Sequence, residues 1–136
     1  YAVDIEETPR IYGNTEFMGL GGSNPTGNNT PNEYTEEQLE YKLDVLLSHT
    51  PPSRTVLVTH APPQNTLDMS PGGAAGSPAL RRALENVDVV ICGHIHGARG
   101  RVKDGAWVIN PGYAAEGQAA IIDLETMDVV WIDSVV

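Results

Sequence analysis

Two segments decide the fold: residues 55–60 read Thr-Val-Leu-Val-Thr-His, and residues 89–96 read Val-Val-Ile-Cys-Gly-His-Ile-His. Each begins with a short apolar run, typical of a strand that is buried on both faces of a sheet. Between them, Ser77 and Pro78 predict the start of a helix, because serine caps helix N-termini and proline suits the first helical position. Strand, helix and strand in this order form a βαβ unit, so we expect the two strands to lie parallel in one sheet.

Outward from this unit, an earlier helix is predicted to begin at Thr35, where Gln38 completes a capping box. Leucines at 39, 43, 46 and 47 then form an apolar stripe that can pack against a sheet. Residues 16–20 are expected to form a short strand within the loop-rich stretch 13–32. The later strands, at residues 107–110, 118–124 and 129–136, are expected to form an antiparallel extension.

The chain length of 136 residues suits a single domain, which we expect to span residues 1–136. The net charge of −10 disfavours binding of nucleic acid by a basic face and binding to anionic membranes. No apolar run approaches the roughly 20 residues of a membrane-spanning helix. The only cysteine, Cys92, lies in an apolar run and is interpreted as a buried reduced thiol, which excludes a disulfide framework and favours a cytoplasmic location.

Three of the four histidines lie at the ends of the two predicted parallel strands. His60 and His94 follow these strands, and His96 comes two residues later. Because parallel strands share their carboxyl edge, these imidazoles are expected to open onto one crevice, where Zn, Mn, Fe or Ni could bind. One such histidine by itself is more often a packed or loop residue, and His49 is expected to do no more than contact the end of the first helix.

The motifs resemble those of the calcineurin-like metallophosphoesterases. The resemblance rests on Val-Leu-Val-Thr-His-Ala-Pro at 56–62, Cys-Gly-His-Ile-His at 92–96 and Ile-Asn-Pro-Gly at 109–112. Gly-Gly-Ser-Asn-Pro at 21–25, Thr-Pro-Asn-Glu-Tyr at 30–34 and Gly-Ser-Pro-Ala-Leu-Arg at 76–81 resemble a branch of small prokaryotic phosphoesterases. The likeness extends over essentially the whole chain.

This resemblance implies an α/β fold, namely half of a four-layer αββα sandwich, and a centre with two divalent metal ions. His60 and His94 would bind one ion and His96 the other, and the metal is Mn, Fe, Zn or Ni. The implied activity is hydrolysis of a phosphodiester or small phosphomonoester by a metal-bound hydroxide. The alternative is a scaffold or binding module of the same fold without catalysis.

The motifs that the family carries in its first half, Asp-x-His, Gly-Asp and Gly-Asn-His/Cys-Asp, are missing from this chain. The chain is therefore interpreted as the C-terminal half of such an enzyme, with the catalytic residues expected in the other half. That half could come from a separate chain, and a homo-oligomer is the other expected assembly.

Three further residues are weaker candidates for the site. Arg99 is a candidate for binding the substrate phosphate, although Arg99, Arg101 and Lys103 equally suit one face of a solvated edge strand. Asn110 is expected to form a turn before Pro111, or to support a metal ligand from behind. Asp68 follows His60 in a loop and could approach the site.

Overall fold

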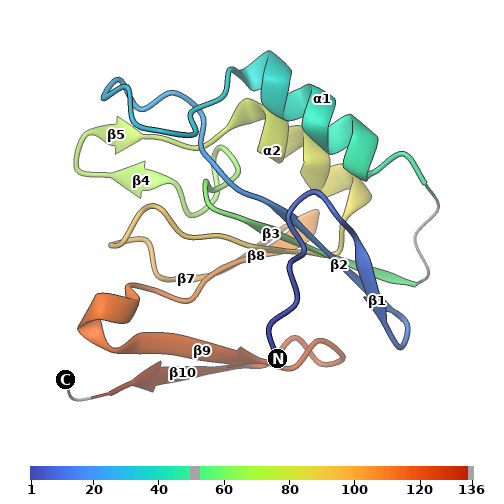
Figure 1. The fold of residues 1–136 in the computed structure, drawn as a ribbon. Helices are drawn as coiled ribbons and strands as arrows, with labels where there is room; N and C mark the ends of the chain where they lie inside the picture. The colour runs from blue at the N-terminus through green and yellow to red at the C-terminus, as the bar shows by residue number, and fades with distance from the viewer. Residues whose placement is uncertain (50–52, 135–136) are drawn as a thin grey trace.

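The computed structural model describes residues 1–49 and 53–134, which form a mixed β-sheet with two helices on one face and a hairpin on the other (Figure 1). The strands, in their order across the sheet, are β1 Arg10–Tyr12, β2 Thr15–Leu20, β3 Arg54–Thr59, β6 Val89–Ile91, β8 Ala106–Asn110 and β7 Gly100–Asp104. The four central strands are parallel, and the two edge strands pair antiparallel with their neighbours. The carboxyl ends of β2, β3, β6 and β8 therefore lie along one edge.

The predicted βαβ unit is confirmed: β3 and β6 are parallel neighbours, and α2 Pro78–Ala83 lies between them in the chain. The Ser77 hydroxyl caps α2 by accepting from the Leu80 amide at 3.2 Å, and a 3-10 turn, Leu84–Asn86, follows the helix. The other predicted helix is α1 Glu36–Leu46, which begins at Thr35 with both bonds of the capping box present. These caps are local, which is why the sequence predicts them.

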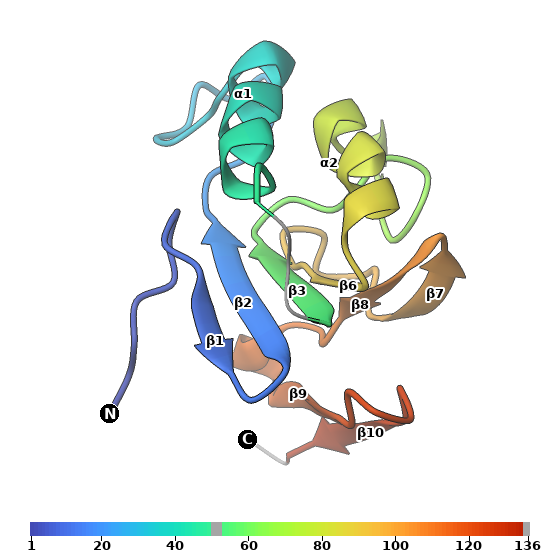
Figure 2. The ribbon, with the colours of Figure 1, turned by 90° about the vertical axis from the view of Figure 1, so that its right-hand side faces the viewer.

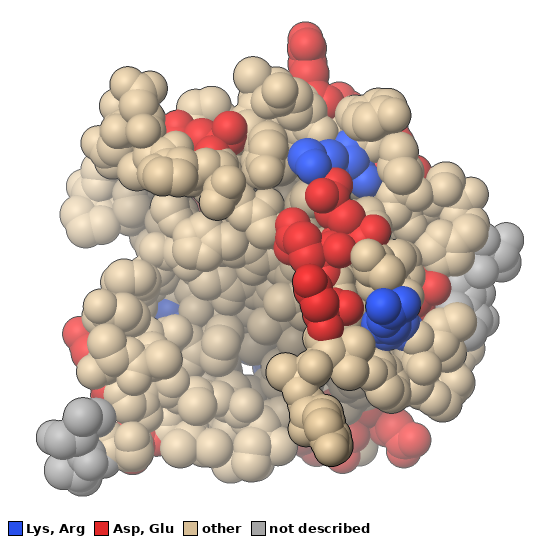
Figure 3. Space-filling view, in the orientation of Figure 1, with Lys and Arg blue, Asp and Glu red and all other residues tan. Residues whose placement is uncertain are grey.

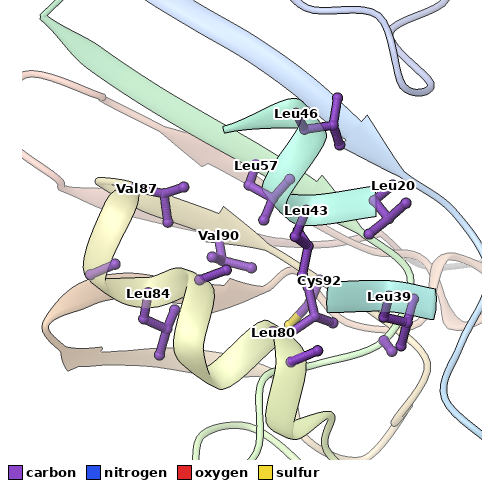
Figure 4. Close-up of a cluster of buried hydrophobic side chains, with 14 of the residues drawn as sticks. Leu20, Leu39, Leu43, Leu46, Leu57, Leu80, Leu84, Val87, Val90 and Cys92 are labelled. Atoms are coloured by element: carbon purple, nitrogen blue, oxygen red, sulfur yellow. The ribbon is translucent and has the colours of Figure 1, made fainter. Parts of the chain in front are cut away.

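The main core lies between the two helices and the sheet (Figure 2). The close-up in Figure 4 shows side chains of both helices meeting those of the strands. The buried members that it labels are Leu39, Leu43 and Leu46 of α1, Leu80 of α2, Leu84 of the 3-10 turn that follows it, and Leu20, Leu57, Val87, Val90 and Cys92. This apolar layer holds the parallel strands in register, so it also fixes the loops at their carboxyl ends.

The opposite face of the sheet is covered by a hairpin of β9 Gln118–Ile122 and β10 Val129–Asp133, preceded by a 3-10 turn, Ala114–Glu116. Val56, Val89 and Ile109 of the sheet are buried against Ile122, Val129 and neighbouring apolar residues. This antiparallel pair confirms the predicted C-terminal hairpin. Residues 135 and 136 of the predicted last strand lie outside the described residues.

One predicted pairing is wrong. The sequence places residues 107–110 in the antiparallel extension, but β8 is parallel to β6 and lies inside the six-stranded sheet. Its antiparallel partner is β7, which forms the edge beyond it. Val108 and Ile109 are both fully buried, so β8 is covered on both faces, as a central strand must be. The alternating charges of β7 are those of a solvated edge strand.

A second short hairpin, β4 Met69–Ser70 and β5 Gly73–Ala74, lies between β3 and α2. It projects from the carboxyl edge of the sheet beside the loop of residues 21–34 (Figure 1). No helix among the described residues is long and apolar enough to cross a bilayer.

Candidate metal centre

The structure brings His60 and His94 together at the carboxyl edge of the sheet. His60 follows β3 directly, and His94 lies three residues beyond β6. His60 Nε2 and His94 Nδ1 are 2.9 Å apart, and the two rings meet edge to face with their centroids separated by 4.9 Å. One nitrogen donates and the other accepts, so at least one of the two imidazoles is neutral in this arrangement.

The backbone around His94 explains how its ring reaches His60. The Gly93 amide donates to the His60 carbonyl at 3.0 Å, and the Ile95 amide donates to the Gly93 carbonyl at 2.7 Å. This tight turn places His94 itself at φ +64°, in the left-handed region that few residues other than glycine adopt. The strained position is thus occupied by the candidate ligand and not by the glycine before it. Such strain persists only where the surrounding structure holds it.

Asn110, at the end of β8, holds this turn from behind. Its Nδ2 donates to the carbonyl of Ile95 at 3.0 Å, and its Oδ1 accepts from the amide of Gly112 at 2.9 Å. Ile95 lies between His94 and His96 in the chain, so the buried amide of Asn110 fixes the backbone that carries both imidazoles. The side chain thus forms the expected turn before Pro111 and also supports the histidine loop.

His96 adopts a different environment from the other two histidines. It is exposed, and its ring stacks on Tyr113 with centroids 3.8 Å apart and planes 11° from parallel. Within residues 1–49 and 53–134, no group of three or more histidine, cysteine or carboxylate side chains is arranged as a ready metal site. The prediction that His60, His94 and His96 bind metal ions thus stays a prediction.

The electrostatics of His94 favour its metal-binding form. Burial lowers the pKa of its imidazole, and the neighbouring His60 and His96 lower it further, against a smaller opposing effect of Glu33. A lowered pKa keeps the ring neutral at neutral pH, and only the neutral ring can bind a metal ion.

The residues at this edge fit part of a metal centre. Two nitrogens that bind one tetrahedral zinc ion lie about 3.3 Å apart, and the 2.9 Å between His60 Nε2 and His94 Nδ1 is close to that spacing. A bridged pair of ions also needs a carboxylate, and none joins these imidazoles among the described residues. His60 and His94 therefore fit the imidazole ligands of a metal centre, and the carboxylate ligands would have to come from elsewhere.

Arg99 links the histidine loop to the C-terminal hairpin. Its guanidinium donates to Asp133 Oδ1 at 2.6 Å and to the carbonyls of Ile132 and Ala119 at 2.9 and 3.3 Å. It also lies over the Trp131 ring at 5.2 Å. These contacts engage both terminal nitrogens, and a role in phosphate binding stays a prediction.

The contacts of Asp68 and the burial of Cys92 indicate structural roles for both side chains. Asp68 is buried, and its Oδ2 accepts from the amides of Asn65 and Gly76, which holds the loop after β3. Burial raises the pKa of the Cys92 thiol to about 12, so the thiol stays protonated and unreactive at neutral pH.

Two neighbours of the histidines could not be identified from sequence. The carboxylate of Glu16, buried on β2, lies 2.7 Å from His49 Nε2. The expectation that His49 only contacts the end of the first helix is therefore wrong, because α1 ends at Leu46 and the imidazole binds a carboxylate of the sheet. Tyr113 stacks on His96 from a loop 17 residues later. No local signal predicts either contact, because both depend on how distant segments pack.

Comparison with known proteins gives the family. A family model described as metallophosphoesterase, calcineurin superfamily, matches residues 6–132. The chain belongs to the calcineurin superfamily of metallophosphoesterases. At the family level this membership indicates metal-dependent hydrolysis of phosphoesters.

The relatives of this metallophosphoesterase chain are longer than it is. An uncharacterized protein of Methanocaldococcus jannaschii is 38% identical over 125 residues, covering 82% of the chain and 54% of that protein. One crystal structure matches with a TM-score of 0.78 at 24% identity, and the match covers 95% of this chain and 53% of the chain in that structure. The structure of TT1561 of Thermus thermophilus matches with a TM-score of 0.71 at 18% identity, covering 95% and 58%. These structures confirm the fold, and the chain spans about half the length of the curated relative it matches.

Proposed function

We propose that this chain contributes the histidine ligands of a two-metal centre that hydrolyses phosphodiesters or small phosphomonoesters. His60 and His94 would bind one divalent ion, and His96 the other, with Mn, Fe, Zn or Ni as the candidate metals. The observation that carries the proposal is the meeting of His60 and His94 at 2.9 Å at the carboxyl edge of the sheet, in a chain of this family.

When bound, two divalent ions would activate a water molecule and neutralise charge on the phosphoryl group. The chain's own residues contribute in other ways. His94 is kept neutral by burial and by the neighbouring imidazoles, so no proton has to leave before it binds an ion. Asn110 orients the backbone between His94 and His96. With a net charge of −10, the protein can attract an anionic phosphoester only where cations dominate locally.

The acidic character is visible on the surface. On the face shown in Figure 3, acidic side chains form a group to the right of the centre, and the hollow to their left is lined mainly by uncharged residues. The remaining ligands, a bridging carboxylate above all, would come from the portion of the family's length that this chain does not span, or from another chain.

The proposal is tested by metal binding. We expect the chain to bind Mn²⁺ or Zn²⁺ in calorimetry, and His60→Ala or His94→Ala to weaken binding by about tenfold or more. His49→Gln is the matched control, because His49 lies with Glu16 and away from the other histidines. Equal metal affinity in all variants would overturn the proposed ligands and favour the alternative of a scaffold without catalysis.

Activity gives a second test. The chain alone is expected to hydrolyse an aryl phosphodiester poorly in the presence of Mn²⁺, because it lacks the carboxylates that complete the centre. Adding the missing portion of a relative in trans is expected to raise the rate, and His94→Ala or His96→Ala is expected to abolish the increase. A full rate from the chain alone would contradict this account. The reduced, buried Cys92 suits the cytoplasmic location that we also propose.

A further inference from the structure

A cavity of about 430 Å³ opens beside His94, between two loop segments that are far apart in the sequence. One wall consists of residues 24–26 and 28, the other of Ser70 and residues 72–76, and His94 and Ile95 complete the lining. Its volume falls within the range of about 300–1,000 Å³ found for small-molecule sites. If the phosphoryl group of a phosphoester bound at the histidines, this cavity would be free for the rest of the substrate.

The two walls are held together by protein contacts. Asn24 Nδ2 on one wall donates to the carbonyl of Ala75 on the other at 3.3 Å, and the carbonyl of Gly76 lies 3.5 Å away. Within the second wall, the Ser70 hydroxyl donates to the Gly73 carbonyl at 2.7 Å and closes the β4–β5 hairpin. The cavity is thus a preformed feature of the fold.

The second wall is formed mainly by main-chain atoms, because most of its residues are glycine or alanine. Gly76 has no room for a side chain, because a Cβ there would meet Gln64 Cα at 2.5 Å and Asp68 Oδ2 at 2.6 Å. Gly73 has φ +110°, and a Cβ there would meet nothing within 4 Å, so its surface is open. A wall of glycine and alanine presents peptide groups to a ligand and few side chains.

The chemistry of the cavity is polar and nearly uncharged. Asn24, Thr26, Asn28 and Ser70 line the cavity with amide and hydroxyl groups. The Asn24 Nδ2 and the hydroxyls of Thr26 and Ser70 donate within the protein, so these three residues offer a ligand their oxygens as acceptors. Among the described residues His94 is the only lining residue with an ionisable side chain. The Asn28 side chain lines the cavity and makes no hydrogen bond to the part of the chain that the structure describes. No aromatic ring other than the His94 imidazole and no lysine or arginine lines the cavity within this same part.

We infer that this cavity binds the alcohol portion of the phosphoester, and that this portion is a neutral polyol such as a sugar. The inference rests on the proposed function, because His94 would place the phosphoryl group at the cavity's edge. Amide, hydroxyl and peptide groups match the hydroxyls of a sugar. A nucleobase would lack a stacking partner, a second phosphate would lack a cation, and an acyl chain would leave polar groups unpaired.

The test measures binding of defined probes by amide chemical shifts. Methyl glucoside, without metal or phosphate, is expected to shift amides of residues 24–28 and 70–76. Inorganic phosphate with Zn²⁺ is expected to shift residues 93–97, and glucose 6-phosphate with Zn²⁺ to shift both groups. Ala74→Phe, which places a ring in the cavity, is expected to weaken methyl glucoside binding about tenfold or more. Ala2→Phe is the control, because Ala2 is exposed and does not line the cavity.

The outcomes separate this inference from the proposed function. If phosphate and Zn²⁺ leave residues 93–97 unchanged while methyl glucoside binds, the metal centre is overturned and the polyol site stands. If phosphate and Zn²⁺ bind but methyl glucoside shifts neither wall, the polyol site is overturned. Equal weakening by Ala74→Phe and Ala2→Phe, or stronger binding of phenyl phosphate than of glucose 6-phosphate, would also overturn it.

Discussion

Asn110 shows how one buried side chain can hold a candidate site. Both of its amide atoms are engaged, one with the Ile95 carbonyl and the other with the Gly112 amide. Because the histidine loop has a strained residue at His94, it needs such support to keep its conformation. The side chain therefore contributes to stability and to the orientation of the imidazoles together.

Asn110→Asp keeps the acceptor for the Gly112 amide but removes the donor to Ile95 and buries a charge. We expect this variant to lower the free energy of unfolding by about 2–4 kcal/mol, measured by urea denaturation. Asn86→Asp, at an exposed position after α2, is the matched control and should change stability by less than about 0.5 kcal/mol. Similar stabilities of the two variants would show that the Asn110 contacts do not hold the loop.

The Glu33 side chain is expected to make the stability of the chain depend on pH. The hydroxyls of Thr26 and Thr30 donate to its carboxylate, and these bonds lower its pKa from 4.5 to about 2. Because the pKa is lower in the folded chain, this contribution to stability is complete above about pH 4.5 and is lost as the pH falls through about 2. Carboxyl NMR should give this midpoint, and Thr30→Val should raise it. A midpoint near 4.5 in the unmodified chain would contradict the prediction.

At the scale of elements, the two helices are joined through their caps. The Ser77 hydroxyl caps α2 and donates to Glu36 Oε2 at 2.7 Å, and the Ala79 amide donates to the same oxygen at 3.0 Å. Glu36 lies in the first turn of α1, so one carboxylate connects the N-termini of both helices. A carboxylate is favourable there because both helix dipoles have their positive ends at this point.

Ser77→Ala is therefore expected to destabilise the chain more than the loss of a single cap. We expect a decrease of about 2–3 kcal/mol in the free energy of unfolding, since the substitution leaves Glu36 without one of its donors. Thr35→Ala removes the exposed cap of α1 and should decrease it by about 1 kcal/mol. Thermal or urea unfolding compares the two, and an equal effect would exclude the link through Glu36.

At the scale of the whole molecule, the outer face of the C-terminal hairpin is apolar and uncovered. Ile121 and Val130 pair across β9 and β10, and their side chains are 62% and 59% exposed. The opposite face of the same hairpin packs against the sheet through Ile122 and Val129. A two-stranded sheet with one apolar face open to solvent also has two strand edges available for pairing.

We expect the chain to associate at high concentration through this face. Light scattering should show a mass that rises with concentration, and Ile121→Lys with Val130→Lys should reduce the rise. Tyr41→Lys is the control, since Tyr41 is 72% exposed on α1 and lies away from the hairpin. A monomer at all concentrations, or an equal reduction by Tyr41→Lys, would contradict the assignment of this face.

Much of the fold could be predicted because its signals are local. The capping box at Thr35, the Ser77–Pro78 helix start and the apolar strands before His60 and His94 each depend on residues within a few positions. The meeting of His60 and His94 also follows from the sequence, since the ends of parallel neighbouring strands share an edge.

Only the tertiary structure decided which distant segments lie side by side. Residues 107–110 have the composition of any buried strand, which does not distinguish their observed parallel place beside β6 from a place in the antiparallel extension. The pairing of His49 with Glu16 and the stacking of His96 on Tyr113 likewise join segments that carry no local signal for one another. The sequence by itself predicted both helices, the central strands and the residue types of the candidate ligands, because these depend on local periodicity and strand ends. It did not predict β1 or the β4–β5 hairpin, which are short and lack an apolar run. Pairing and side-chain contacts depend on packing over long separations, so the tertiary structure decided them.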